Sequence, residues 1–208
     1  MTITYPLSLP AKPGVKAIRW REMTKVGVSV SPFTFQRQVQ RGQGQAWAAD
    51  ITLPTIRDRA VVGEWQAFLL AMNGSQGFFA MGDPDNFGPL GVATGSPVID
   101  GAGQTGPDIA TTGWTVSTTG ILKKGDRIGL GSGATARMHK VLEDVDSDSN
   151  GDATLSLWPR VVIAPSNGAP IELDNPQSMF WFPDGIPERD IDRLGDMTLT
   201  LRVMEHLV

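Results

Sequence analysis

The sequence has no cysteine and only two histidines, His139 and His206, among its 208 residues. Without cysteine the chain has no disulfide bond, no thiolate nucleophile and no zinc site with cysteine ligands. Neither histidine belongs to a motif that pairs a nucleophile with an orienting acid. We therefore expect a protein that is not an enzyme and that uses no cofactor or metal.

Long apolar runs and an excess of positive charge are missing as well. No apolar stretch reaches about eighteen residues and no basic segment leads into an apolar one at the start, so we expect neither a membrane span nor a signal peptide. Lysine and arginine number 18 against 22 aspartates and glutamates, a formal net charge of -4. We therefore predict no sequence-specific nucleic-acid binding and no membrane contact.

Glycine and proline are plentiful, at 24 and 15 residues, and 40% of the sequence is hydrophobic. The glycines and prolines indicate many turns between short strands, and the hydrophobic fraction is sufficient for a packed core. Only one segment has the pattern of a good helix. The predicted fold class is therefore mainly β with one main α-helix.

One stretch of the sequence organises the rest. Alternating apolar residues from Trp47 to Leu53 predict a strand with one buried face. Thr55 is the expected N-cap of the helix, Asn73-Gly74 its end, and residues 77–81 a second strand before a turn over 82–85. The helix has one apolar stripe, formed by Ile56, Ala60, Val61, Trp65, Phe68, Leu69 and Met72.

Composition divides the chain into three parts. Residues 1–14 carry three prolines and predict an arm that either is extended or becomes ordered only on contact, and we expect its deletion to weaken assembly and leave the fold. Residues 15–86 and 175–208 share clean strand alternation and predict one helix-bearing domain. Residues 87–174 are rich in glycine, threonine and serine, and predict an inserted small antiparallel β-barrel or sandwich with its firmest strands at 127–130, 137–142 and 153–162.

A polar segment precedes the strand that begins near Gly44. Ile18 to Trp20 and Val26 to Val30 predict two strands with a turn near residues 22–24, and the segment 36–45 contains five glutamines, two arginines and a single apolar residue. Its ends are expected to pair as a long hairpin, whose tip is either solvated or a polar subunit contact. The residues that we expect to make such a contact are Gln36, Arg37, Gln38, Gln40, Arg41, Gln43 and Gln45.

Two motifs resemble ligand sites, and their context argues against both. Residues 101–106 fit G-x-G-x-x-G, but the Pro and Thr-Thr-Gly that follow are unfavourable for the helix that a dinucleotide site requires. Residues 146–151 fit the first half of a calcium loop, but position 12 is Leu157 instead of glutamate. A glycine loop and a hairpin turn at Asn150-Gly151 explain the two patterns.

Other side chains leave two alternative functions open. Trp114 and Trp158, in the insertion, are either core residues or a platform on which a sugar stacks. Acidic groups in turn-like stretches are either solvated or the carboxylate pair of a glycosidase. These groups are Asp83 with Asp85, and Glu188 with Asp190 and Asp192.

The order of these segments along the sequence resembles that of a known protein family. The similarity spans Val15 to Asp85, Met179 to Val208, and an insertion that contains the turn Leu122-Lys123-Lys124-Gly125-Asp126, the hairpin 144–154 and Leu157-Trp158-Pro159. In this order the chain resembles the distal tail proteins of bacteriophages with long non-contractile tails, the siphovirus type. The resemblance implies a tail-tube-like β-sandwich flanked by a helix, with an inserted outer domain, in a ring of six copies.

The same resemblance implies a function. The chain would be a structural virion protein, made in the cytoplasm of the host bacterium, whose ring joins the tail tube to the tail tip or baseplate. Its implied partners are its own copies, the tail tube protein and the tail tip or baseplate hub protein. No functional residues of the family carry over one by one. A carbohydrate-binding β module on the tail and a cell-wall hydrolase are the alternatives.

Overall fold

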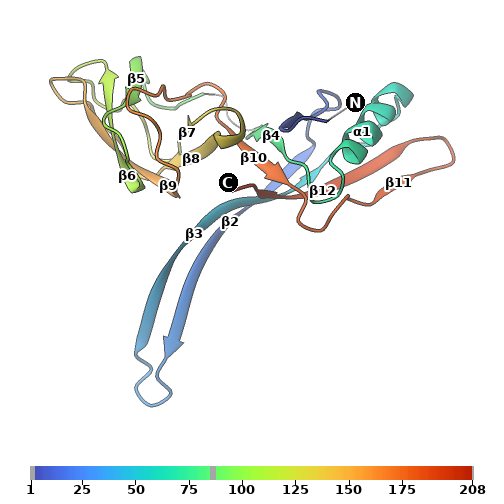
Figure 1. Ribbon diagram of the computed structural model, residues 1–208, viewed down its shortest axis with the longest axis horizontal. Helices are drawn as coiled ribbons and strands as arrows, with labels where there is room; N and C mark the ends of the chain where they lie inside the picture. The colour runs from blue at the N-terminus through green and yellow to red at the C-terminus, as the bar shows by residue number, and fades with distance from the viewer. Residues whose placement is uncertain (1–2, 85–87, 208) are drawn as a thin grey trace.

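The computed structural model describes residues 3–84 and 88–207 (Figure 1). As predicted, the fold is mainly β, with one α-helix, α1 (Arg59–Ala71), among these residues. The first sheet contains β1 (Leu7–Ser8), β2 (Ala17–Val30), β3 (Arg37–Thr52), β4 (Phe79–Gly82), β10 (Gln177–Trp181), β11 (Arg189–Ile191) and β12 (Met197–Glu205). The second contains β5 (Gly95–Ile99), β6 (Gly106–Trp114), β7 (Arg127–Leu130), β8 (Arg137–Val141) and β9 (Ala153–Val161), with the short 3-10 helix η1 (Gly133–Thr135) between β7 and β8.

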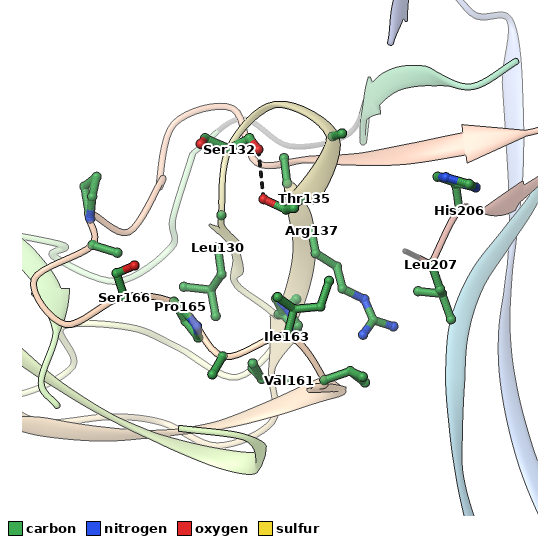
Figure 2. Close-up of a pocket in the computed structure, with 18 residues that line it drawn as sticks. Leu130, Ser132, Thr135, Arg137, Val161, Ile163, Pro165, Ser166, His206 and Leu207 are labelled. Atoms are coloured by element: carbon green, nitrogen blue, oxygen red, sulfur yellow. Dashed lines mark hydrogen bonds between the residues drawn. The ribbon is translucent and has the colours of Figure 1, made fainter. Parts of the chain in front are cut away.

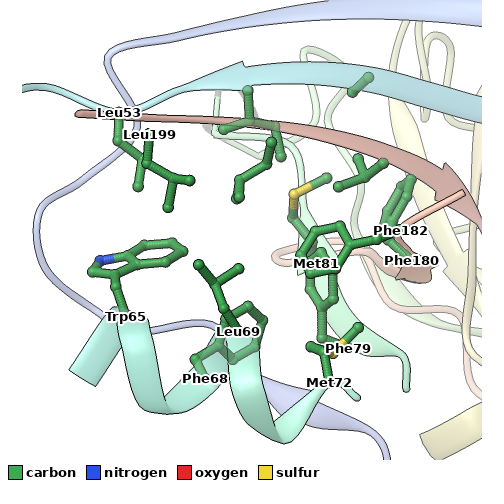
Figure 3. Packing of buried hydrophobic residues seen from close by; sticks show 14 of the residues in the cluster. Leu53, Trp65, Phe68, Leu69, Met72, Phe79, Met81, Phe180, Phe182 and Leu199 are labelled. Atoms are coloured by element: carbon green, nitrogen blue, oxygen red, sulfur yellow. The ribbon is translucent and has the colours of Figure 1, made fainter. Parts of the chain in front are cut away.

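The first sheet has seven strands, and α1 packs on one of its faces. Its strand order is β1-β4-β10-β12-β3-β2, with β11 added beside β12. Figure 3 shows the side chains of Trp65, Phe68 and Leu69 directed from the helix toward apolar residues of the strands. The alternating residues of β12 from Met197 to Val203 are buried in this core, as their period of two predicts.

The helix begins three residues later than predicted. Asp58, and not Thr55, is the N-cap, and its carboxylate accepts a hydrogen bond of 2.8 Å from the backbone nitrogen of Ala60. Ile56 is still extended because its backbone bridges Met197 on β12. The predicted end is confirmed, since Asn73 and Gly74 have φ angles of 50° and 72°, a left-handed pair that stops the helix.

Residues 3–14 are docked on the chain's own core. Leu7 and Leu9 pack against the first hydrophobic cluster, and β1 pairs in parallel with β4. The Tyr5 hydroxyl donates to the carbonyl of Ala71 over 2.8 Å, and Trp65 Nε1 donates to the carbonyl of Lys12 over 2.7 Å. Of the two alternatives for this arm, order only on contact with a neighbour is wrong for these residues, because they pack on their own chain.

The second sheet has the order β5-β6-β9-β8-β7 and a hydrophobic cluster of its own. The strands predicted at 127–130, 137–142 and 153–162 are confirmed as β7, β8 and β9. Strands β5 and β6 lie in the glycine- and threonine-rich part of the sequence, which has no regular apolar period. Met138 and Trp158 extend from this sheet into the first cluster, so the two sheets share apolar contacts. The predicted boundary at residues 86 and 87 lies outside the described residues.

Candidate subunit interface

Strands β2 and β3 extend together beyond the other strands of the first sheet as a long two-stranded ribbon (Figure 1). We call the two sheets and the helix, without this ribbon, the body. The turn predicted near residues 22–24 is absent. Strand β2 continues through this point, and the register shift between Thr24 and Val26 marks a bulge in β3, where residues 42–44 lie opposite Lys25. The glutamine-rich segment is likewise not the tip of the hairpin, because it pairs with β2 as the first half of β3, and the chain reverses at residues 31–36. We call residues 22–44 the ribbon.

A tight and ordered turn forms the end of the ribbon. The backbone nitrogen of Ser31 donates to the carbonyl of Gln36 over 3.0 Å, and that of Phe35 donates to the carbonyl of Ser31 over 2.9 Å. The Ser31 hydroxyl also accepts from the nitrogen of Thr34. Phe33 and Phe35 are 92% and 81% exposed at this turn. The tip therefore presents two aromatic rings to its surroundings on a defined backbone.

The two faces of the ribbon differ in chemistry. Residues directly opposite each other in an antiparallel pair point to the same face. Val26 lies opposite Arg41, Val28 opposite Val39, and Val30 opposite Arg37. One face is therefore made of valines and arginines. The other face is polar, since Gly27 lies opposite Gln40 and Ser29 opposite Gln38.

The ribbon is exposed on both faces. Val26, Val28 and Val30 are 47%, 56% and 52% exposed, and Val39 is 40% exposed. A lone two-stranded hairpin is only marginally stable in water, because it buries little apolar surface. The 23 residues of the ribbon match the roughly 20–30 residues that each side of a stable protein interface contributes. The ribbon therefore has the size and the uncovered apolar face of an interface.

Six of the seven predicted contact residues lie in the exposed ribbon or its tip. Arg37 and Arg41 lie on the valine face, Gln38 and Gln40 on the polar face, and Gln36 and Gln43 are also exposed. Gln45 differs, because it is half-buried at the root of the ribbon. Its side-chain oxygen accepts from the backbone nitrogen of Arg160 over 2.7 Å. That these residues contact another subunit stays a prediction.

Gly42 allows the bulge to form beside the glutamines. Gly42 is one of the bulged residues of β3, and a Cβ atom at this position would lie 2.5 Å from the carbonyl oxygen of Lys25 on β2. Any larger residue at position 42 would push the two strands apart. The glycine in this polar sequence thus has a steric role in the ribbon.

A buried ion pair fixes the root of the ribbon to both sheets. Arg137 on β8 binds the carboxylate of Glu205 on β12 through two hydrogen bonds, of 2.9 Å and 3.1 Å. The side chains are only 12% and 1% exposed. The guanidinium also donates to the carbonyl of Gln45 over 2.7 Å and to that of Arg160 over 3.1 Å. One side chain therefore connects β3, β8, β9 and β12.

Further hydrogen bonds complete this joint. The Glu205 carboxylate accepts from the backbone nitrogen of Trp47 over 3.0 Å and from the Ser178 hydroxyl over 3.1 Å. That hydroxyl accepts from the nitrogen of Met138, and the indole of Trp47 donates to the carbonyl of Met138. Sequence reasoning missed the joint, because its charged partners are 68 residues apart and belong to no local motif.

A pocket of about 340 Å³ lies beside the joint (Figure 2). Both histidines of the chain, His139 and His206, line it, and no aspartate or glutamate of residues 3–84 and 88–207 is among its lining residues. Burial lowers the pKa of His139 to about 3, so this imidazole is neutral at physiological pH. Its Nδ1 lies 2.6 Å from the carbonyl of Pro159 and carries the proton, because a carbonyl only accepts. The carbonyl of Pro159, and not a carboxylate, therefore orients this imidazole.

Two of the acids proposed for hydrolysis, Asp83 and Asp192, are engaged within the chain. Asp83 is buried in an ion pair with Arg127, whose pKa burial lowers. Asp85 lies outside the described residues. Asp192 accepts from the nitrogens of Leu194 and Asp196 and so shapes its own turn. Among the residues that the structure describes, no group of three or more His, Cys, Asp or Glu residues is placed to hold a metal ion.

The two motifs that resemble ligand sites are turns. Asp148 accepts from the nitrogens of Asn150 and Asp152, which lowers its pKa and directs its carboxylate to its own backbone. Asp146 accepts from the nitrogen of Gly120 over 2.6 Å. Residues 101–106 lead into strand β6 and not into a helix, so the dinucleotide context is absent.

Both tryptophans of the insertion pack against other residues of the chain. Trp114 is 3% exposed, and its Nε1 donates to the Thr111 hydroxyl over 2.8 Å. Trp158 is half-buried and packs edge-on against Trp47, with ring centroids 4.5 Å apart. Both indoles are therefore core residues.

A scan against models of protein families finds no match for this chain, and a search of curated proteins finds none either. Across residues 3–84 and 88–207, no helix has the length and apolar character needed to cross a membrane.

Proposed function

We propose that this chain is a structural subunit of a bacteriophage tail, whose copies close into a ring that joins the tail tube to the tail tip or baseplate. The exposed ribbon is the single observation that carries the proposal. It is an ordered element with an apolar face that nothing in the same chain covers. The place in the tail rests on the resemblance of the sequence to distal tail proteins.

The arrangement of the ribbon favours a ring of identical copies. Each copy has one projecting ribbon and one body, so a ribbon that binds the body of the next copy makes a head-to-tail contact. Such contacts close into a ring when the rotation between copies fits a whole turn. The family that the sequence resembles has six copies, and we propose a hexamer with the tail tube protein and the hub protein as neighbours along the tail axis.

The charge of the chain is compatible with this role. DNA passes through the centre of a phage tail, and a channel for DNA must not bind phosphates strongly. Basic surfaces bind the DNA backbone in any sequence, whereas this chain has a formal net charge of -4. The arginines on the ribbon are, in this proposal, used in protein contacts.

The two alternatives have less support. A carbohydrate-binding module needs an indole face open to solvent, whereas Trp114 is buried and Trp158 is half-buried against Trp47. A hydrolase needs a carboxylate beside a histidine or a second acid, and His139 is neutral in a pocket with no Asp or Glu among its described lining residues. Acids do line a second pocket, but Asp50 and Asp184 there are paired with arginines. The ring therefore remains the function that the geometry supports best.

The valine face gives a direct test. Replacement of Val28 and Val39 by serine removes apolar contact from one face, and replacement of Ser29 and Gln38 by alanine changes the opposite face at the same level of the ribbon. We expect the first variant to lose oligomers and the second to retain more of them, as measured by size-exclusion chromatography with light scattering. Identical oligomers in both variants would contradict a role for the valine face.

The position in the tail needs a separate experiment. An antibody against the purified protein should label phage tails at the junction between tube and tip in negative-stain images. Label along the whole tube or on the capsid would contradict the proposal.

A further inference from the structure

The pocket beside the joint has walls suited to an aromatic ring. Leu130, Val161 and Ile163 form much of its apolar lining, and Leu207 closes the opposite side (Figure 2). The polar groups along it include the hydroxyls of Ser132 and Ser166. Such a mixture, mostly apolar with a few polar groups, is typical of pockets that take a hydrophobic group from a partner.

Its volume matches the tip of the ribbon. A cavity of about 150 Å³ lined by aliphatic side chains holds one benzene molecule. A pocket of about 340 Å³ therefore has space for two phenyl rings. The tip of the ribbon presents two, those of Phe33 and Phe35, and these are among the most exposed apolar side chains of the molecule.

The tip cannot reach this pocket in its own chain. The pairing of β2 with β3 continues to Val30 and Arg37, so the ribbon is held extended up to the turn. At about 3.3 Å per residue, the strand from Glu22 to Val30 carries the tip on the order of 30 Å from the body. Figure 1 shows the ribbon directed away from the second sheet and from the other strands of the first sheet. A tip that fills the pocket must therefore come from another copy.

We propose that the ribbon tip of one copy, with Phe33 and Phe35, docks in the pocket formed by Leu130, Val161, Ile163 and Leu207 of the next copy. This inference rests on the proposed ring and names the contact that closes it. Two observations favour a second copy of this chain as the partner that fills the pocket. The 23 residues of the ribbon fall within the roughly 20–30 residues that one side of a stable interface contributes. Its tip also exposes two aromatic rings, which the pocket has space to hold. The joint of Arg137 and Glu205 holds the pocket beside the root of the receiving ribbon.

Disulfide trapping tests the contact, because the chain has no cysteine of its own. Thr34→Cys places a thiol between the two rings, and Ser166→Cys places one at the pocket. After mild oxidation of a mixture of the two variants, we expect a covalent heterodimer, since a disulfide forms only when the two Cα atoms approach within about 7 Å. Ala67→Cys, on the exposed side of α1, is the matched control and should give at least tenfold less dimer with Thr34→Cys.

Two further variants address the same contact from each side. Phe33→Ala with Phe35→Ala removes the rings, and Ala134→Trp fills the pocket without touching the ribbon. Each should weaken assembly at least tenfold in dilution series followed by light scattering. Leu70→Ala removes a side chain that is 63% exposed on α1 and should leave assembly unchanged.

The outcomes separate the two proposals. If the wild-type chain stays monomeric at all concentrations, the ring is wrong and the docking falls with it. If rings form, Thr34→Cys does not cross-link to Ser166→Cys and the phenylalanine variant assembles normally, the docking is wrong and the ring stands. Cross-linking to Ser166→Cys together with loss of rings in both variants supports the docking.

Discussion

Replacement of Arg137 by leucine tests whether the joint holds the two sheets and the ribbon root together. The change leaves the Glu205 carboxylate, 1% exposed, with the Trp47 nitrogen and the Ser178 hydroxyl as its only remaining donors. The carbonyls of Gln45 and Arg160 also lose the donor that the guanidinium supplied. Removal of one partner from a buried ion pair typically costs about 3–5 kcal/mol, because the other charge stays buried and uncompensated. We expect a loss of this size in the free energy of unfolding.

Urea denaturation followed by tryptophan fluorescence measures this loss, since Trp47 and Trp158 both lie at the joint. For a chain of this length, about 3–5 kcal/mol corresponds to a fall of roughly 6–20 °C in the melting temperature. The double variant Arg137→Leu with Glu205→Leu removes both charges and should recover part of the stability, because a buried pair replaced by apolar residues is often close to neutral. A loss below about 1 kcal/mol in the single variant, or no recovery in the double variant, would refute the reasoning.

Two further predictions concern the arm and the buried histidine. Deletion of residues 3–13 should lower the free energy of unfolding by at least about 2 kcal/mol, because Leu7 and Leu9 leave the core and Trp65 Nε1 loses its acceptor. Tyr5→Phe, which removes one hydrogen bond, should cost only about 1 kcal/mol. Equal stability of the deleted and intact chains in urea would show that the arm is not part of the fold. His139 has a depressed pKa in the folded state, so its contribution is complete above pH 6.5, the ordinary value, and is lost as the pH falls toward 3. From pH 7 to pH 5 the wild type should lose about 2 kcal/mol more than His139→Leu, and parallel pH profiles of the two proteins would contradict the burial argument.

The core of the first sheet is predictable from the sequence because its residues follow regular periods. Trp47 to Leu53 alternates as a half-buried strand, and Trp65, Phe68, Leu69 and Met72 form one helical stripe. The bounds of strand β6 cannot be located from the sequence, because glycine and threonine give no apolar period and its pairing with β9 is long-range. The N-cap was misplaced because the bridge between Ile56 and Met197 depends on tertiary structure.

The candidate interface is predictable only in part. The glutamine-rich segment indicates a polar contact, but no period shows that it is a strand, since both of its faces are exposed. The alternation of Val26, Val28 and Val30 does predict the strand opposite, and it was the better signal for the interface. The joint and the pocket depend on residues far apart in the sequence, so no local pattern reveals them.

The molar mass of the purified wild-type chain in solution is the most direct test of the ring. A hexamer of 22.3 kDa subunits has a mass of about 134 kDa, and negative-stain images of that fraction should show closed rings. This is the result that the exposed ribbon predicts. A single species of 22.3 kDa at every concentration, with the ribbon still uncovered, would contradict it.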